Sequence, residues 1–87
     1  MNAKMQPGGA DRAREMVVFS AVAARGSFSA AGRDLDLTPS AVSRTIDRIE
    51  ARLGVTLAQR PTRRLSLTAD GERYLARGSA ILEELAE

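Results

Sequence analysis

The chain has 87 residues, 44% of them hydrophobic and 28% charged, which is the profile of one small globular domain. It contains no cysteine and no histidine, so disulfides, thiol chemistry, serine–histidine hydrolysis and the usual transition-metal ligand sets are excluded. We therefore expect no enzymatic activity, no metal site and no cofactor.

The net charge of +2 is unevenly distributed along the chain. Residues 38–77 carry eight arginines and four acidic residues, whereas residues 78–87 carry three glutamates and no basic residue. A basic middle and an acidic end are typical of a surface that meets a polyanion in one place. No apolar run is long enough to span a bilayer. Residues 1–10 form a predicted flexible tail, which lacks the apolar core of a signal peptide. We therefore expect a cytoplasmic protein.

A first helix is predicted from about Asp11 to Ala24, because apolar residues recur there at helical spacing: Met16, Val18, Phe19, Val22 and Ala23. Gly26 can adopt the left-handed conformation that ends this helix. A short second helix is predicted from about Ala30 to Leu35, with Ser29 as its N-cap.

The second helix contains Gly32, which costs about 1 kcal/mol there relative to alanine. We therefore expect Gly32 to admit the close approach of a crossing helix. Asp36 and Leu37 are predicted to form a tight turn in which Leu37 is an apolar plug.

A third helix begins at Thr38 and Pro39, an N-cap residue followed by proline at the first helical position, where the missing N–H costs nothing. Its apolar residues recur at helical spacing and define a buried stripe of Val42, Ile46, Ile49 and Leu53. The opposite face is polar and presents Ser40, Ser43, Arg44, Asp47 and Arg48. Gly54 ends the helix.

Helical periodicity is lost from Val55 to Leu67. Two short apolar runs, residues 55–57 and 65–67, flank a turn that contains Pro61, which predicts a small β-hairpin. Thr68 can then cap a last helix over residues 69–87. Apolar residues of that helix form a two-heptad seam of Leu75, Gly78, Leu82 and Leu85, widened by Tyr74 and Ile81.

This order of elements predicts a mostly α winged helix-turn-helix domain over residues 11–68, a three-helix core plus a small β-hairpin wing, followed by a linker helix. In such a domain the recognition helix needs one apolar face for anchorage and an opposite polar, cationic face for the major groove of DNA. The wing needs cations at its tip because it lies against phosphates, and Arg60, Arg63 and Arg64 are found there.

The residues also resemble the N-terminal DNA-binding domain of LysR-type bacterial transcription regulators. The resemblance covers residues from about 14 to 87 without a gap. It rests on motifs in the family's order and spacing, namely Phe19–Ala31, Ala41–Arg44, Ile49-Glu50, Leu53-Gly54, Leu57, Arg60, Arg63-Arg64 and Leu67–Gly71. The resemblance implies sequence-specific binding of double-stranded DNA, without a reaction or a cofactor.

The resemblance further implies that the start of the third helix contacts DNA. We expect its two serines to face base edges or thymine methyl groups, and Arg44 to reach a guanine or a phosphate. The N-termini of the second and third helices would meet phosphates, and two wing arginines would lie in or beside the minor groove. The predicted DNA-binding residues are Ser29, Thr38, Pro39, Ser40, Ser43, Arg44, Arg48, Arg63 and Arg64.

LysR-type linker helices pair across a two-fold axis, so the resemblance implies a homodimer on an inverted-repeat operator. The predicted dimerisation residues are Leu75, Gly78, Ile81, Leu82 and Leu85. The alternative for this seam is packing on the first helix of the same chain. Full-length relatives carry a C-terminal effector-binding domain that is absent here, so we expect a small-molecule effector to bind outside this chain.

Some positions depart from the family pattern or stay open. Pro39 stands where glutamine is frequent, which removes a side chain able to read adenine, and Ala58 replaces a phenylalanine that packs beneath the wing. Arg60 could contact DNA or instead support the wing by pairing with an acidic residue. Two other functions are alternatives: a winged helix that docks on a protein partner, and a protein that coats DNA without sequence preference.

Overall fold

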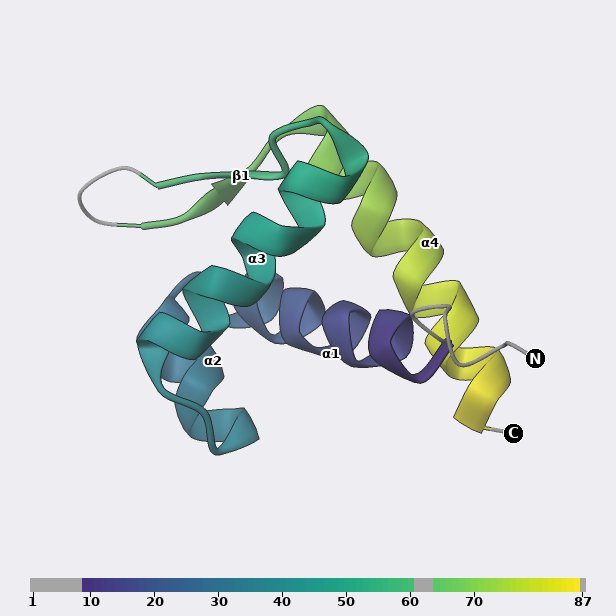
Figure 1. Cartoon of the computed structure of the whole chain (residues 1–87), viewed down its shortest axis with the longest axis horizontal. Coiled ribbons are helices and arrows are strands. Elements are labelled where there is room, and N and C mark those ends of the chain that lie inside the picture. The colour runs from purple at the N-terminus through teal and green to yellow at the C-terminus, as the bar shows by residue number, and fades with distance from the viewer. Residues whose placement is uncertain (1–8, 61–63, 87) are drawn as a thin grey trace.

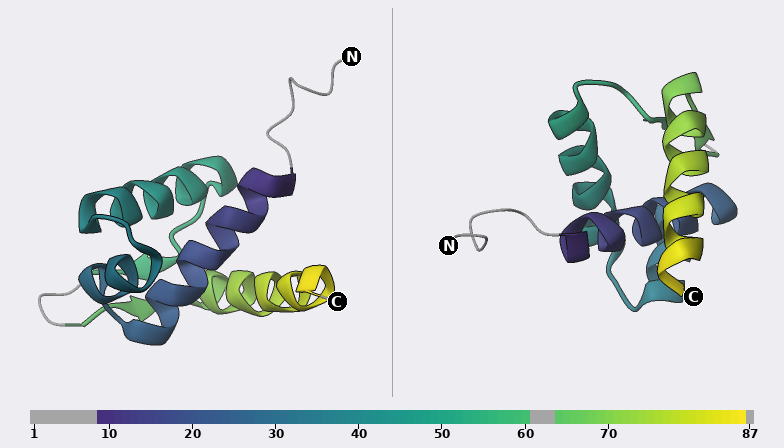
Figure 2. Two further views of the ribbon diagram at one scale, coloured as in Figure 1. Left: turned by 90° about the horizontal axis from the view of Figure 1, so that it is seen from below. Right: turned by 90° about the vertical axis from the view of Figure 1, so that its right-hand side faces the viewer.

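The computed structural model describes residues 9–60 and 64–86. Their elements, in chain order, are α1 (Gly9–Arg25), α2 (Phe28–Leu35), α3 (Pro39–Leu53), β1 (Ala58–Gln59), β2 (Ser66–Leu67) and α4 (Ala69–Ala86). The first three helices pack on one another, the hairpin projects beside α3, and α4 returns to pack on α1 (Figures 1 and 2). The predicted mostly helical architecture is therefore confirmed, and within these ranges no helix is long and apolar enough to cross a membrane.

The core lies between α1, α2 and α3, and Leu57, which directly precedes β1, packs into it. Its buried residues are Val18, Phe19, Val22, Ala31, Val42, Ile46, Ile49 and Leu57. The apolar stripe predicted for the third helix is confirmed for the three of its residues that are buried in α3. The prediction is wrong at Leu53, which is 44% exposed because it lies in the last turn of α3, at the end of the stripe.

The first turn of α2 differs from the prediction. Gly26 follows α1 with φ +65°, as expected, and α2 then begins at Phe28 with Ser27 as its N-cap. The Ser27 hydroxyl accepts a hydrogen bond from the amide of Ala30 at 3.1 Å. Ser29, the predicted N-cap, lies inside the helix instead, because the extended residue that starts α2 is the one directly after the glycine.

The turn between α2 and α3 accounts for Gly32. A Cβ atom on Gly32 would lie 2.4 Å from the carbonyl oxygen of Leu37, so the turn, and not the predicted crossing helix, explains the glycine. Asp36 is left-handed, with φ +62°, and the amide of Leu37 donates to the carbonyl of Gly32 at 2.8 Å. Leu37 is not the expected plug, because it is 41% exposed and lines a cavity between α1 and α3.

Both ends of α3 follow the prediction. Thr38 is the N-cap, and its hydroxyl accepts a hydrogen bond from the amide of Ala41 at 3.0 Å. Pro39 occupies the first helical position, and Gly54 ends the helix with φ +72°. These caps fix where α3 begins and ends, and therefore which of its residues lie on its exposed face.

The predicted hairpin is confirmed as a short antiparallel pair. Its opposed residues are Ala58 with Leu67 and Gln59 with Ser66. The first strand begins after the predicted run of residues 55–57, because Leu57 turns into the core, where it is 1% exposed. Helix α1 begins two residues earlier than predicted, and the predicted turn around Pro61 and the tail over residues 1–8 lie outside the described residues.

Thr68 joins the hairpin to α4. Its hydroxyl accepts a hydrogen bond from the amide of Gly71 at 3.0 Å, as expected of an N-cap, and donates one to the carbonyl of Thr56 at 2.6 Å. Its amide donates to the carbonyl of Leu57 at 3.0 Å. Gly71 packs against that same carbonyl, and a Cβ atom on Gly71 would lie 2.0 Å from the oxygen.

Tyr74 is the aromatic contact between α4 and α1. Its ring meets the ring of Phe19 edge to face, with centroids 5.1 Å apart. The Tyr74 hydroxyl is buried and has no hydrogen-bond partner in the described part of the chain. Burial raises the pKa of the Tyr74 phenol, and the nearby Glu15 carboxylate raises this pKa further. The phenol is therefore neutral at physiological pH, which is the form that a buried site favours.

The apolar seam of α4 is divided between the core and the surface. Leu75 packs against the core, and Gly78 is buried beside Met16 of α1, as the alternative of packing on the first helix requires. One turn further along, Ile81 is 42% exposed, and Leu85 is 67% exposed. The second half of the seam is thus an apolar surface on the outside of this chain.

Gly71→Ala is expected to lower the free energy of unfolding by about 1–3 kcal/mol, the usual cost of overpacking, because the new Cβ atom would collide with the Leu57 carbonyl. Gly78→Ala is the matched control, since it is also buried inside α4 but its Cβ atom would meet the flexible Met16 side chain at 3.3 Å. The control is expected to be neutral or more stable, because alanine is the better helix former. Urea unfolding measures both, and equal stability of the two variants would contradict this account.

Candidate nucleic-acid interface

One face of α3 is polar and lies outside the core. Ser40, Arg44 and Arg48 are exposed on it, and Ser43 is half-buried at its edge. Within residues 9–60 and 64–86, no ion pair joins Arg44 or Arg48 to an acidic residue. The Arg48 guanidinium contacts the Thr45 hydroxyl at 3.4 Å. The structure therefore brings four of the predicted residues together, with two guanidinium groups open to an anionic partner.

The start of α3 presents a free backbone donor. The first amides of any helix have no acceptor within the helix. Pro39 has no N–H, the amide of Ala41 donates to the Thr38 hydroxyl, and the amide of Val42 donates to the Thr38 carbonyl at 3.1 Å. Among the described residues this leaves the amide of Ser40 without an acceptor, at the positive end of the helix dipole, where it can donate to a phosphate.

The other predicted residues lie on neighbouring elements. Ser29 is exposed in the first turn of α2, where its hydroxyl is not used as a cap. Arg64 is exposed just before β2, and its side chain lies against the Gly26 turn that precedes α2. Arg63 lies outside the described residues, so its role stays a prediction.

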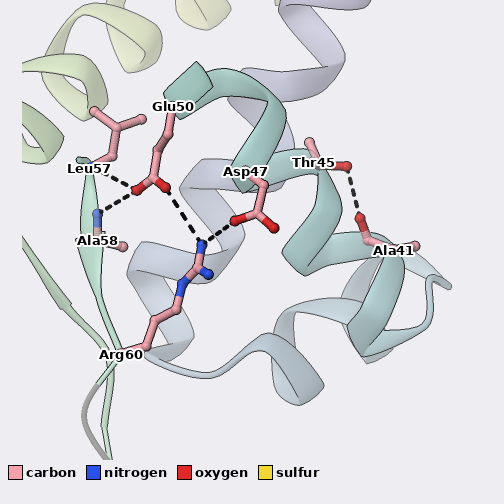
Figure 3. A network of polar contacts seen from close by, with 7 residues as sticks. All are labelled: Ala41, Thr45, Asp47, Glu50, Leu57, Ala58 and Arg60. Carbon is pink, nitrogen blue, oxygen red and sulfur yellow. Dashed lines mark hydrogen bonds and ion pairs between the residues drawn. The ribbon is translucent and has the colours of Figure 1, made fainter. Parts of the chain in front are cut away.

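Glu50 of α3 anchors the hairpin, as Figure 3 shows. Its Oε2 atom accepts hydrogen bonds from the amide of Leu57 at 2.8 Å and from the amide of Ala58 at 3.2 Å. The Glu50 side chain is only 19% exposed, so these charge-assisted bonds are partly protected from water. Sequence reasoning missed this role, and the available signal was an acidic residue directly after the buried Ile49.

Arg60, which directly follows β1, pairs with acidic side chains of α3. Its guanidinium donates to Oδ1 of Asp47 at 2.9 Å and lies 3.8 Å from Glu50 (Figure 3). It also lies over the ring of Phe28, 5.2 Å from the centroid, which is a cation–π distance. Of the two interpretations that the sequence left open for Arg60, pairing with acidic residues is the one observed.

Two further ion pairs join the three helices to one another. Arg52 of α3 donates to Glu15 of α1 at 2.9 Å, and Arg25 of α1 donates to both carboxylate oxygens of Asp34 in α2 at 2.7 and 2.8 Å. Partly exposed pairs of this kind contribute about 0–1 kcal/mol each to stability, so the helix packing rests on the apolar core. No group of acidic side chains in the described ranges could hold a metal ion.

Three packed helices, of which the third has a polar and cationic outer face, together with a hairpin held at its side, define a winged helix-turn-helix domain. Residues 13–72 match the bacterial regulatory helix-turn-helix proteins of the lysR family. The chain belongs to this family, as the DNA-binding domain of a LysR-type transcription regulator. The prediction of a non-enzymatic protein agrees with membership of a family of regulators.

Solved structures of this family share the fold. The DNA-binding domain of CbnR, solved in complex with DNA, gives a TM-score of 0.82 at 35% sequence identity, and the match covers 85% of both chains. The DNA-binding domain of BenM in complex with catB site 1 DNA gives a TM-score of 0.82 at 27% identity, covering 85% of this chain and 83% of that chain.

A similar regulator, CrgA of Neisseria meningitidis serogroup C (strain 8013), is 49% identical over 72 residues, which are 83% of this chain and 24% of CrgA. The activator AaeR of Escherichia coli (strain K12) is 36% identical over 77 residues, which are 88% of this chain and 25% of AaeR. The chain therefore spans about a quarter of the length of these relatives.

Glu50→Ala is expected to lower the free energy of unfolding by about 1.5–3 kcal/mol, because two strand amides lose a charged acceptor. Hydrogen exchange at the amides of Leu57 and Ala58 is expected to accelerate relative to the rest of the core. Glu84→Ala, at an exposed position of α4, is the control and should change stability by less than about 0.5 kcal/mol. Unchanged protection of the two strand amides in the Glu50 variant would show that another group anchors the hairpin.

Proposed function

We propose that this chain binds double-stranded DNA sequence-specifically, as a homodimer on an inverted-repeat operator. The observation that carries the proposal is the outer face of α3, which combines a capped helix start, two serines and two arginines without acidic partners in the described ranges. Such a face fits the major groove, where short polar side chains read base edges and guanidinium groups bind guanine or phosphate. The CbnR and BenM domains, which share the fold, were solved on DNA.

In the proposed complex the start of α3 enters the major groove. Ser40 and Ser43 face base edges or thymine methyl groups, and Arg44 reaches a guanine or a phosphate. Arg48, one turn further along the helix, binds a phosphate. Pro39 supplies apolar contact without a hydrogen bond, so discrimination at that position rests on shape.

Contacts on either side of the groove position the domain in this proposal. The starts of α2 and α3, at Ser29 and Thr38, meet phosphates of the duplex backbone. Arg63 and Arg64 of the wing lie in or beside the minor groove, where narrow A·T tracts attract arginine. Contacts of this kind fix the register of the protein on the duplex but carry no direct base readout.

The proposed dimer forms through α4. Since Leu75 and Gly78 pack on the rest of the chain, the apolar surface left for a second copy is Ile81 and Leu85, with half-buried Leu82 between them. Leu75 and Gly78 support this surface from behind. A two-fold axis that passes through this surface of α4 would place the two α3 helices a whole number of helical turns of DNA apart.

Docking on a protein partner is the weaker alternative, because the outer face of α3 has none of the aromatic or leucine anchors that such interfaces use. The proposal extends to the whole regulator by analogy with its family. A small-molecule effector would bind a C-terminal domain outside this chain, and the protein would act in the cytoplasm.

Fluorescence anisotropy tests the function, with the chain titrated onto an inverted-repeat duplex from upstream of its gene and onto a scrambled duplex, across a salt series. We expect tighter binding to the native duplex and an affinity that falls as salt rises, because phosphate contacts release counterions. Arg44→Ala is expected to weaken binding to the native duplex by about 1–3 kcal/mol. Arg77→Ala, an exposed arginine of α4, is the control and should bind like the wild type.

The outcomes separate the alternatives. Equal binding of the wild type to both duplexes would support a protein that coats DNA without sequence preference, and no binding at low salt would support docking on a protein. An equal loss on both duplexes in Arg44→Ala would identify a phosphate contact, whereas a loss confined to the native duplex identifies a base contact. No loss on either duplex would contradict the placement of α3.

Leu85→Asp is expected to produce a folded monomer with much weaker operator binding, because it places a charge in the apolar surface of α4 while Leu85 itself is exposed in the monomer. Ala76→Asp introduces the same charge on the opposite side of the helix, nine residues away, and should remain dimeric. Sedimentation equilibrium measures the mass of each variant. A dimer that survives Leu85→Asp would refute the proposed interface.

A further inference from the structure

Asp47 places a carboxylate on the face of α3 that the proposed function assigns to DNA. It follows Ser43 by four residues and Arg44 by three, so these side chains share one side of the helix. The Asp47 side chain is 57% exposed. A free carboxylate at this place would repel the phosphates that the neighbouring arginines attract, so its effect depends on what it pairs with.

The partner of Asp47 is Arg60, which is also the first cation of the wing. Figure 3 shows the Arg60 side chain directed back toward α3, where it donates to Asp47 at 2.9 Å. The distance from Arg60 to Oε1 of Glu50 is 3.8 Å, too long for a hydrogen bond, and Oε2 of Glu50 is occupied by the strand amides. The hydrogen bond to Asp47 is therefore the closest contact of the Arg60 guanidinium, shorter than the ion pair with Glu50 and the cation–π contact with the Phe28 ring.

We propose that Asp47 limits the affinity of this domain for DNA phosphates, because its pairing with Arg60 withholds a guanidinium group that would otherwise bind the duplex backbone. The inference rests on the proposed function and concerns how strongly the same surface binds. Within the pair the two charges cancel, and the Glu50 carboxylate, 3.8 Å from Arg60, places one further negative charge beside them. Once released, Arg60 has a long side chain, already 37% exposed, with which to reach a phosphate.

The expected effect is independent of DNA sequence. Phosphate contacts add to affinity for every duplex, whereas base contacts add to affinity for one. Removal of the Asp47 carboxylate should therefore strengthen binding to native and scrambled duplexes by the same factor. One additional phosphate contact steepens the slope of log affinity against log salt by about 0.9, which corresponds to roughly five-fold tighter binding at about 0.15 M salt.

The test compares Asp47→Ala with Asp70→Ala. Both variants remove one carboxylate from an aspartate–arginine pair, but Asp70 pairs with Arg73 on α4 and lies outside α3 and the wing. Each is titrated by fluorescence anisotropy onto the native and scrambled duplexes across a salt series, and urea unfolding confirms that each is folded. Asp47→Ala is expected to show the five-fold gain and the steeper slope on both duplexes, and Asp70→Ala neither.

A double variant identifies the group responsible for the gain. Asp47→Ala/Arg60→Met has the same net charge as the wild type and is expected to return to wild-type affinity and slope. Affinity that stays raised in the double variant would mean that loss of the carboxylate acts without Arg60. A gain of equal size in Asp70→Ala would mean that net charge alone is responsible, and either result overturns the proposal.

Other results also contradict it. Weaker binding to both duplexes together with lower stability would make the pair a structural support of the wing. A loss confined to the native duplex would make Asp47 a reader of the exocyclic amine of cytosine. Wild-type binding with an unchanged Asp47→Ala would refute this inference alone, whereas a wild type that binds no duplex would refute the proposed function first.

Discussion

The hairpin of this domain depends on hydrogen bonds from outside its own ladder. A two-stranded hairpin is marginally stable in water, and among residues 9–60 and 64–86 two residues of each strand are paired. The Glu50 carboxylate supplies the missing restraint by accepting from the amides of Leu57 and Ala58, while Arg60 returns from the wing to α3. Because Glu50 belongs to α3, the helix that carries the proposed reading face also sets the direction of the wing.

Much of the fold could be predicted because it follows from interactions between residues close in sequence. The start of α3 at Thr38 and its end at Gly54 are set by local capping, and its buried stripe is set by helical spacing. The sequence does not distinguish Ser27, the observed N-cap of α2, from Ser29, because both satisfy the residue preference for a cap. The choice between them depends on where the chain leaves the turn at Gly26, which is a property of the backbone path and not of composition.

The residues of the candidate site that lie on one face of α3 could be predicted from helical spacing. Ser40 and Arg44 share the outer face of α3 by spacing alone. Contacts between distant residues were not predictable: Glu50 meets amides of another element, and Arg52 meets Glu15, which is 37 positions away. No local pattern encodes such pairs, because they exist only after α1, α3 and the hairpin have packed. Periodicity alone predicts that this face of α3 is exposed and polar. The resemblance to LysR-type regulators is what assigns the face to DNA.

Thr68 makes the junction between the wing and α4 stiff. Its hydroxyl and amide together make three hydrogen bonds, to the first turn of α4 and to the segment that leads into β1, and Gly71 lies against the Leu57 carbonyl without room for a Cβ atom. A junction held in this way does not act as a hinge. If α4 tilted, the wing and α3 would therefore move with it as one rigid body. In a dimer joined through α4, the angle between the two α4 helices would then determine the distance between the two α3 helices.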